Sequence, residues 1–136
     1  MITYKEFGCE YLDQVMPLYK SENWDIYSEP DRVKRAFENS QYILGAFEGE
    51  RLIGFIRCIG DGEYDLYVSD LIVNKEYRRQ GIEKTLLSKA MERYSHIENF
   101  VLMTGLEEES NNRFYRSMGM KEFKENRLVG YIRDDN

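Results

Sequence analysis

The chain has 136 residues, 42% of them hydrophobic, which is enough for one domain with a substantial core. Its formal net charge of −6 argues against nucleic acid as a partner. No apolar run approaches the length that spans a bilayer, and the first residues lack the apolar core of a signal peptide. We therefore expect a single domain over residues 1–136, located in the cytoplasm and without a membrane partner.

The residue types that most often hold metals are sparse and dispersed. Cys9 and Cys58 lie far apart, and neither has the spacing of a metal site, so both are interpreted as reduced thiols. His96 follows a predicted helix and is interpreted as a C-terminal cap rather than a base. We expect no bound metal.

The first forty residues combine one strand with two helices. Residues 2–5 have the pattern of a strand, and helical spacing of apolar residues predicts a helix over 10–20. Pro17 lies inside that helix and predicts a bend or a break. Asp31 fits the N-terminus of a second helix that continues through Asn39.

From Tyr42 onward the hydrophobic period changes to that of strands. Two apolar segments flank the turn Glu48-Gly49-Glu50, which predicts a β-hairpin. The elements predicted in this part are strands over 41–48, 51–59 and 65–73, a helix from 82 to 94, a strand over 100–106, a short helix that ends at Gly119, and strands over 120–124 and 127–133. This order predicts an α/β fold with antiparallel hairpins and one parallel crossover.

A strand, a basic turn and an amphipathic helix follow one another over residues 70–94. At the start of such a helix, backbone N–H groups lack partners and the helix dipole adds positive charge, so the site suits a phosphate. Arg78, Arg79 and Lys84 add formal charge around the turn, and Gly81 lets the backbone approach a ligand closely. A solvated turn with a glycine in it would show the same pattern.

This stretch resembles the acetyl-CoA signature of the GNAT superfamily of N-acetyltransferases: Val73, Arg78-Arg79-Gln80-Gly81-Ile82 and Leu86-Leu87. The family's core motif, [Gln/Arg]-x-x-Gly-x-[Gly/Ala], falls on Arg78, Gly81 and Glu83, and the first two positions match. The resemblance in element order covers nearly the whole chain. It implies the GNAT fold, an α/β fold with a mixed central β-sheet of six to seven strands flanked by about four helices.

The resemblance further implies that acetyl-CoA is the acyl donor and binds where two strands of the sheet separate. The backbone of Leu71, Ile72 and Val73 would pair with the pantetheine arm, while their side chains remain core residues. Asn111 and Asn112 precede Tyr115 by four and three residues, so one of them could reach the same site as that tyrosine. The turn that would hold the pyrophosphate consists of Arg78, Arg79, Gln80, Gly81, Ile82, Glu83 and Lys84.

Glu83 departs from the family motif, which has Gly or Ala at this position. A carboxylate in the first turn of a helix is favoured by the dipole by about 0.3–1 kcal/mol, but it repels a pyrophosphate. Its side chain could turn outward to pair with Arg79 or Lys84 and leave the backbone N–H free. Otherwise, cofactor binding would be weakened or lost.

Tyr115 and Asp70 are the candidate catalytic residues. Tyr115 falls on a tyrosine that often serves as general acid in the family, and a phenol with a pKa of about 10 is protonated at neutral pH. A core-facing helix tyrosine is the alternative interpretation. Asp70 alternates with apolar strand residues, so burial would raise its pKa toward that of a general base, unless a β-bulge turns it to solvent or toward an arginine.

Trp24 and Tyr27 lie between the first two helices, in the part of the GNAT fold that walls the acceptor site. Their rings, beside Glu22, Asp25 and Glu29, would suit a cationic or aryl-alkyl amine, although packing under a loop explains them equally well.

The function that we predict is therefore N-acetyltransferase activity, with direct transfer of the acetyl group from acetyl-CoA to a small-molecule amine. Two alternatives remain: a GNAT-fold module that binds CoA or a partner without catalysis, and an acetyltransferase acting on a protein amine. We expect a monomer or a homodimer.

Overall fold

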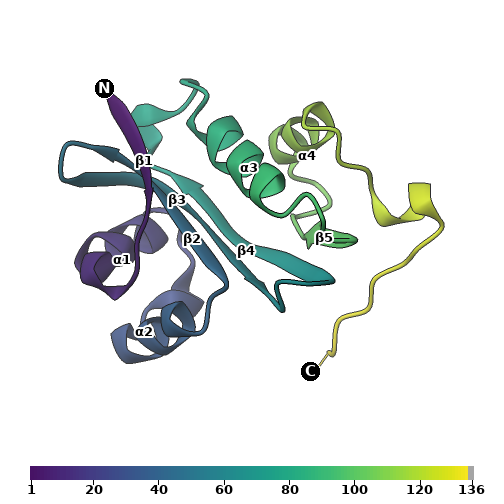
Figure 1. The fold of residues 1–136 in the computed structure, drawn as a ribbon, viewed down its shortest axis with the longest axis horizontal. Helices are drawn as coiled ribbons and strands as arrows, with labels where there is room; N and C mark the ends of the chain where they lie inside the picture. The colour runs from purple at the N-terminus through teal and green to yellow at the C-terminus, as the bar shows by residue number, and fades with distance from the viewer. Residues whose placement is uncertain (135–136) are drawn as a thin grey trace. The chain divides into compact units, whose positions relative to one another are not determined.

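The computed structural model describes residues 1–134, and the chain forms two compact units (Figure 1). The first, Met1–Met103, contains the whole β-sheet and is called the sheet unit below. The second begins at Thr104 and is called the C-terminal unit.

The sheet unit is built on five strands in the order β1-β2-β3-β4-β5. Pairing is antiparallel from β1 to β4 and parallel between β4 and β5. The parallel pair requires a crossover connection, which α3 supplies. The strands are β1 Ile2–Glu6, β2 Tyr42–Glu48, β3 Arg51–Gly60, β4 Asp65–Val73 and β5 Asn99–Leu102.

Three α-helices cover the sheet, with α1 and α2 on one face and α3 on the other (Figure 1). α1 spans Leu12–Ser21, α2 spans Pro30–Glu38 and α3 spans Ile82–Arg93. The helices of the first face bury Val15, Leu18, Tyr19, Val33 and Phe37 in a cluster with strand residues that include Phe47, Phe55 and Ile72.

α1 continues through Pro17, at which the sequence predicts a bend or a break. Pro17 removes only the hydrogen bond that would reach back to the carbonyl of Asp13. The buried apolar stripe of α1 is retained across this position, and packing on the sheet holds the helix together.

The C-terminal unit contains α4, Glu109–Ser117, and a 3₁₀ helix, η4, over Phe123–Asn126. The prediction of six to seven strands is wrong for the described residues: the sheet has five, and neither 120–124 nor 127–133 forms a strand. The strand predicted over 100–106 is observed as the shorter strand β5, Asn99–Leu102.

The failure of the two last strands has a physical reason. A strand needs a hydrogen-bonding partner, and an apolar stretch with β propensity cannot supply one by itself. Leu128, Val129, Tyr131 and Ile132 are 60–94% exposed. Upstream, local bonds favour the 3₁₀ turn, where Glu122 and Glu125 form a capping box and both pair with Arg116.

Within residues 1–134, no helix is long and apolar enough to cross a membrane.

Candidate functional site

The sheet opens along β4. β4 pairs with β5 only from Asp65 to Val68, and the register given for the pair ends at Leu102. A register shift between Arg57 and Cys58 of β3 inserts Ser69 as an extra residue in β4. Residues 69–73 therefore have no strand partner on the β5 side within the sheet unit, and Leu71–Val73, the predicted pantetheine-binding segment, lie on this edge.

The turn after β4 leads directly to the start of α3. A 3₁₀ helix at Lys75–Tyr77 is followed by Arg79 and Gly81 with positive φ angles of 66° and 79°. Gly81 is the N-cap of α3, and no side chain in the described part of the chain caps the helix there. Backbone N–H groups in the first turn of α3 therefore lack a capping acceptor, and the space where a Cβ of Gly81 would lie is open.

The basic side chains of this turn are not equivalent. Arg79 and Lys84 are exposed and have no hydrogen-bond or ion-pair partner in the described chain. Arg78, in contrast, pairs with Glu22, which directly follows α1. Two cations of the turn are thus free to meet an anion at the start of α3.

Glu83 lies half-buried in the first turn of α3. Burial raises the pKa of its carboxyl group, the charge of Arg78 lowers it, and the charge of Glu22 adds to the rise. The expected partners were Arg79 and Lys84. The structure instead provides Arg78 as the compensating charge.

Asp70 is buried, and its surroundings are polar. Arg57 Nε lies 2.5 Å from Asp70 Oδ2, and the Tyr19 hydroxyl donates to the same oxygen at 2.6 Å. The other arms of the guanidinium donate to Ser40 and Ser69. The alternative noted from the sequence, a bulge that turns Asp70 toward an arginine, describes what the structure shows. Asp70 Oδ1 is buried and has no hydrogen-bond partner among residues 1–134.

This network involves two residues that sequence reasoning missed. Tyr19 is almost completely buried, and burial, with the charge of Asp70 as a further cause, raises the pKa of its phenol far above the ordinary value. Arg57 is 3% exposed. Neither carries a local sequence signal, because both are identified only by a contact with a residue distant in the chain.

Trp24 and Tyr27 form an aromatic cluster with Tyr19. The ring of Tyr27 stacks on that of Tyr19 at 4.3 Å between centroids, and Trp24 lies 6.2–6.3 Å from both. Trp24 and Tyr27 are half-buried and pack against the core. Core packing therefore explains the buried part of each ring, and a contact of the two rings with an acceptor stays a prediction.

Tyr115 and Asn111 belong to the C-terminal unit, where both lie on α4. The half-buried Tyr115 ring lies 5.3 Å from that of Phe114, and Asn111 Nδ2 donates to Thr104 Oγ1 at 3.3 Å.

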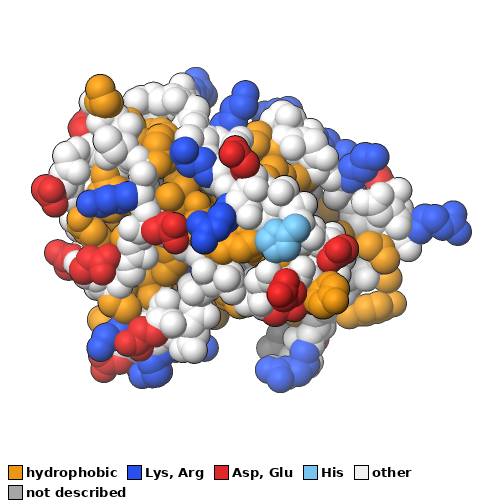
Figure 2. Space-filling view, in the orientation of Figure 1, with side chains coloured by type: hydrophobic (Ala, Val, Ile, Leu, Met, Phe, Trp, Pro, Cys, Tyr) orange, Lys and Arg blue, Asp and Glu red, His pale blue; other side chains and the backbone are white. Residues whose placement is uncertain are grey.

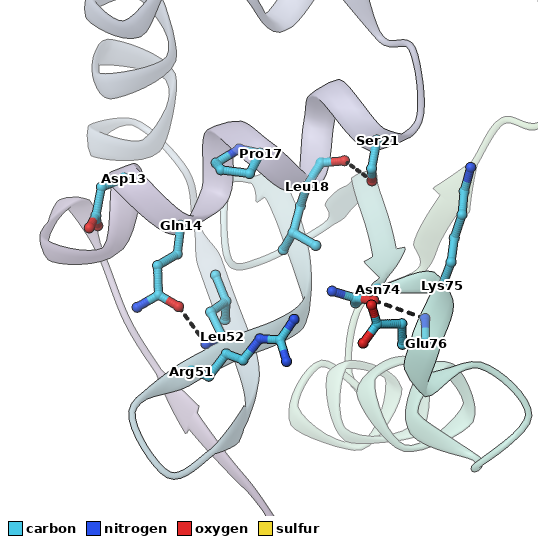
Figure 3. Close-up of a pocket in the computed structure, with 10 residues that line it drawn as sticks. All are labelled: Asp13, Gln14, Pro17, Leu18, Ser21, Arg51, Leu52, Asn74, Lys75 and Glu76. Carbon is cyan, nitrogen blue, oxygen red and sulfur yellow. Dashed lines mark hydrogen bonds between the residues drawn. The ribbon is translucent and has the colours of Figure 1, made fainter.

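A cavity of about 320 Å³ lies between α1 and the start of the turn (Figure 3). Its volume is at the lower end of the range for small-ligand sites. None of the predicted site residues lines it. The lining consists of Asp13, Gln14, Pro17, Leu18, Ser21, Arg51, Leu52, Asn74, Lys75 and Glu76.

Charges of both signs are scattered over the face shown in Figure 2, and no continuous basic patch is present on that face. Among residues 1–134, no group of three or more His, Cys, Asp or Glu side chains could hold a metal ion.

Comparison with known proteins links these features to one family. A model described as the acetyltransferase (GNAT) family matches residues 7–120. The structure of a GNAT-family acetyltransferase from Streptococcus pneumoniae TIGR4 has a TM-score of 0.87 and 33% identity, with 99% of this chain and 98% of that chain covered.

Two more distant proteins differ in the acceptor that their names indicate. N-alpha-acetyltransferase 30 from Schizosaccharomyces pombe is 27% identical over 139 residues, which cover 96% of this chain and 90% of that protein. AAC(6′)-Iy, solved with the bisubstrate analogue CoA-S-monomethyl-acetylneamine, is 14% identical and has a TM-score of 0.77, with coverage of 98% and 99%. At this identity, the similarity to AAC(6′)-Iy shows a shared fold and does not extend to the acceptor.

Proposed function

Because the chain belongs to the GNAT family of acetyltransferases, we propose that it transfers the acetyl group of acetyl-CoA directly to a small-molecule amine. The observation that carries this proposal is the opened sheet. An unpaired edge at residues 69–73 leads into a helix start with uncapped N–H groups and two free cations. A thioester with a strand-like arm and a pyrophosphate has a complementary pattern of hydrogen bonds and charge.

The proposed donor site follows this pattern. The backbone of Leu71, Ile72 and Val73 binds the pantetheine arm as an added strand would. The turn of residues 78–84 binds the pyrophosphate through its backbone N–H groups and through Arg79 and Lys84. Asn111, on α4, is proposed as a further ligand. Acetyl-CoA supplies the activated acyl group, and the remaining steps belong to the chain's own residues.

In the proposed reaction, the acceptor ammonium first loses one proton, and the neutral amine then attacks the acetyl carbonyl. The C–N bond forms, the C–S bond breaks, and the new amide nitrogen loses a second proton to solvent. Tyr115 gives its proton to the leaving thiolate and recovers one from solvent. Asp70 Oδ1, the buried carboxylate oxygen without a partner, is the atom proposed to take the ammonium proton. Because Asp70 already forms an ion pair with Arg57, loss of the proton through water is the competing route.

Trp24 and Tyr27 are proposed to contact the acceptor. A second candidate acceptor, the amine of a protein N-terminus, is favoured by the similarity to N-alpha-acetyltransferase 30 over almost the whole chain. A panel of small amines and short peptides, scored by release of the CoA thiol, separates these two. If the protein binds acetyl-CoA but no acceptor releases thiol above the solvent rate, the non-catalytic alternative is favoured.

Titration with CoA tests the donor site. Arg79→Gln should raise the Kd for CoA about tenfold, because each charge-assisted contact to a phosphate contributes roughly 1.5–3 kcal/mol. Arg32→Gln on α2, which is also exposed, is the matched control for loss of one positive charge. Equal affinities for the two variants would exclude Arg79 from the site.

Substitution of the proposed acid tests the catalytic step. Tyr115→Phe keeps the ring and removes the proton donor, so kcat should fall about 100-fold with unchanged affinity for CoA. Tyr64→Phe, at an exposed tyrosine of the sheet unit, is the control. A Tyr115→Phe variant with the kcat of wild type would assign the proton transfer to another group.

A further inference from the structure

The first basic residue of the turn is tied to the segment between α1 and α2. Arg78 Nη2 lies 3.3 Å and 3.2 Å from the two carboxylate oxygens of Glu22, which is 56 residues away in sequence. The side chains are 45% and 21% exposed. Glu22 directly follows α1 and lies two residues before Trp24, so the pair joins the proposed donor site to the proposed acceptor wall within the sheet unit.

A third charge acts on this pair. The charges of both Arg78 and Glu22 affect the pKa of Glu83, the first of them lowering it and the second raising it. One guanidinium therefore compensates two carboxylates on two different elements, and the group as a whole has an excess of negative charge. Removal of Arg78 from the group would leave both carboxylates without the compensation that Arg78 gives them.

The position of Arg78 favours its release from Glu22 when an anion binds. It occupies the same turn as Arg79 and Lys84, next to the uncapped start of α3 where the pyrophosphate is proposed to bind. A guanidinium pairs well with phosphate in a two-pronged geometry, and Glu22 uses only one of its terminal nitrogens. The pair is also partly exposed, so water can replace one partner at little cost.

We propose that Arg78 exchanges Glu22 for the pyrophosphate of acetyl-CoA, and that the released carboxylate of Glu22 then binds a positive charge on the acceptor. This inference rests on the proposed function. Glu22 is thus a binding residue for the acceptor that becomes available only after the donor has bound. Binding of the donor therefore raises the affinity for the acceptor, and the donor binds first.

The proposal also restricts the acceptor class. The nitrogen that attacks the thioester must be neutral, because an ammonium has no lone pair. A cation that stays paired with Glu22 during the attack is therefore a second group on the same molecule. The acceptor class is a diamine or polyamine, with the aromatic rings of Trp24 and Tyr27 near its charged end.

Titration with CoA tests the exchange. Glu22→Gln removes the competitor for Arg78, so CoA should bind about three- to fivefold more tightly, the range expected for loss of a partly exposed ion pair. Glu29→Gln, which removes an equal charge from the same segment without a contact to Arg78, is the matched control. Equal affinities for CoA in the two variants would overturn the exchange.

A double-mutant cycle identifies Arg78 as the cause. In an Arg78→Gln background, Glu22→Gln should no longer change the affinity for CoA, because no guanidinium remains to be released. If the gain persists in that background, it comes from the general field of the protein, and the exchange is overturned.

The acceptor half is tested with 1,3-diaminopropane as the probe and propylamine as the monocation control. The diamine should bind CoA-saturated wild-type protein at least about threefold more tightly than CoA-free protein, and Glu22→Gln should abolish this difference. No dependence on CoA overturns the role of Glu22 toward the acceptor. If wild-type protein fails to bind CoA at all, the proposed function itself fails, which is a distinct outcome.

Discussion

Two arginine–carboxylate pairs in the sheet unit have the same chemistry and opposite environments. Arg57 and Asp70 join neighbouring strands, with side chains 4% and 0% exposed. Arg78 and Glu22 join a turn to the end of α1, with side chains 45% and 21% exposed. The first pair makes further hydrogen bonds, since Tyr19 donates to Asp70 and Arg57 donates to Ser40 and Ser69. Within residues 1–134, the side chains of the second pair have no further hydrogen-bond partner.

The difference determines what each pair can do. A buried charge that loses its partner has no water to replace it, so the Arg57–Asp70 pair is fixed. A partly exposed pair exchanges its partner for water or a ligand at low cost. One pair holds α1 on the sheet through Tyr19, and the other is able to respond to an anion.

The largest expected effect comes from breaking the buried pair. Asp70→Asn should lower the free energy of unfolding by about 3–5 kcal/mol, because the Arg57 charge remains buried without compensation. Urea denaturation measures this loss. The double variant Arg57→Met/Asp70→Leu should recover part of it, since the Tyr19 hydroxyl still lacks its acceptor. A loss below about 1 kcal/mol in Asp70→Asn would show that water reaches the pair.

A smaller effect is expected at the hydroxyl that joins α1 to the pair. Tyr19→Phe should cost about 1.5–3 kcal/mol in urea denaturation, since it removes a hydrogen bond to a charged group and keeps the ring. Tyr27→Phe deletes a hydroxyl from the ring stacked on Tyr19 and should stay within about 0.5 kcal/mol of wild type. Similar losses of unfolding free energy in both variants would show that the hydrogen bond from Tyr19 to Asp70 does not stabilise the fold more than the Tyr27 hydroxyl does.

The exposed pair should contribute much less. Glu22→Gln should change the free energy of unfolding by at most about 1 kcal/mol. Any loss should shrink as salt concentration rises, whereas the loss in Asp70→Asn should depend little on salt. A large, salt-independent loss in Glu22→Gln would contradict the contrast between the two pairs.

The smallest effect concerns Glu83, whose pKa is raised chiefly by burial. A carboxyl group with a raised pKa in the folded state favours folding when protonated, so its contribution is lost as pH rises from the ordinary value of glutamate toward the raised one. The melting temperature of Glu83→Gln relative to wild type should therefore increase as pH rises above the ordinary pKa of glutamate. Glu92→Gln, at an exposed position of α3, is the control for loss of one carboxylate from the same helix.

Local patterns in the sequence determined much of the sheet unit. The hairpin around Glu48-Gly49-Glu50, the helices after residues 10 and 31, and the strand–turn–helix unit at residues 70–94 were all predicted and are present. Each depends on hydrophobic period, turn residues and caps, which act over a few residues. The turn with a glycine before a helix start belongs to this class, so its residues could be predicted without a structure.

The tertiary structure alone decided what depends on distant partners. Apolar residues near 120–124 and 127–133 suggested two more strands, but strand formation requires a neighbour that sequence period does not specify. Burial of Asp70 was predicted, while its pairing with Arg57 rather than with solvent depended on a bulge in the sheet. Likewise, the pattern around Arg78 indicated a cation that could bind phosphate. Its contact with Glu22 arises from the packing of α1 beside the turn. A pairing across 56 residues leaves no local signature in the sequence, so this contact could not be predicted.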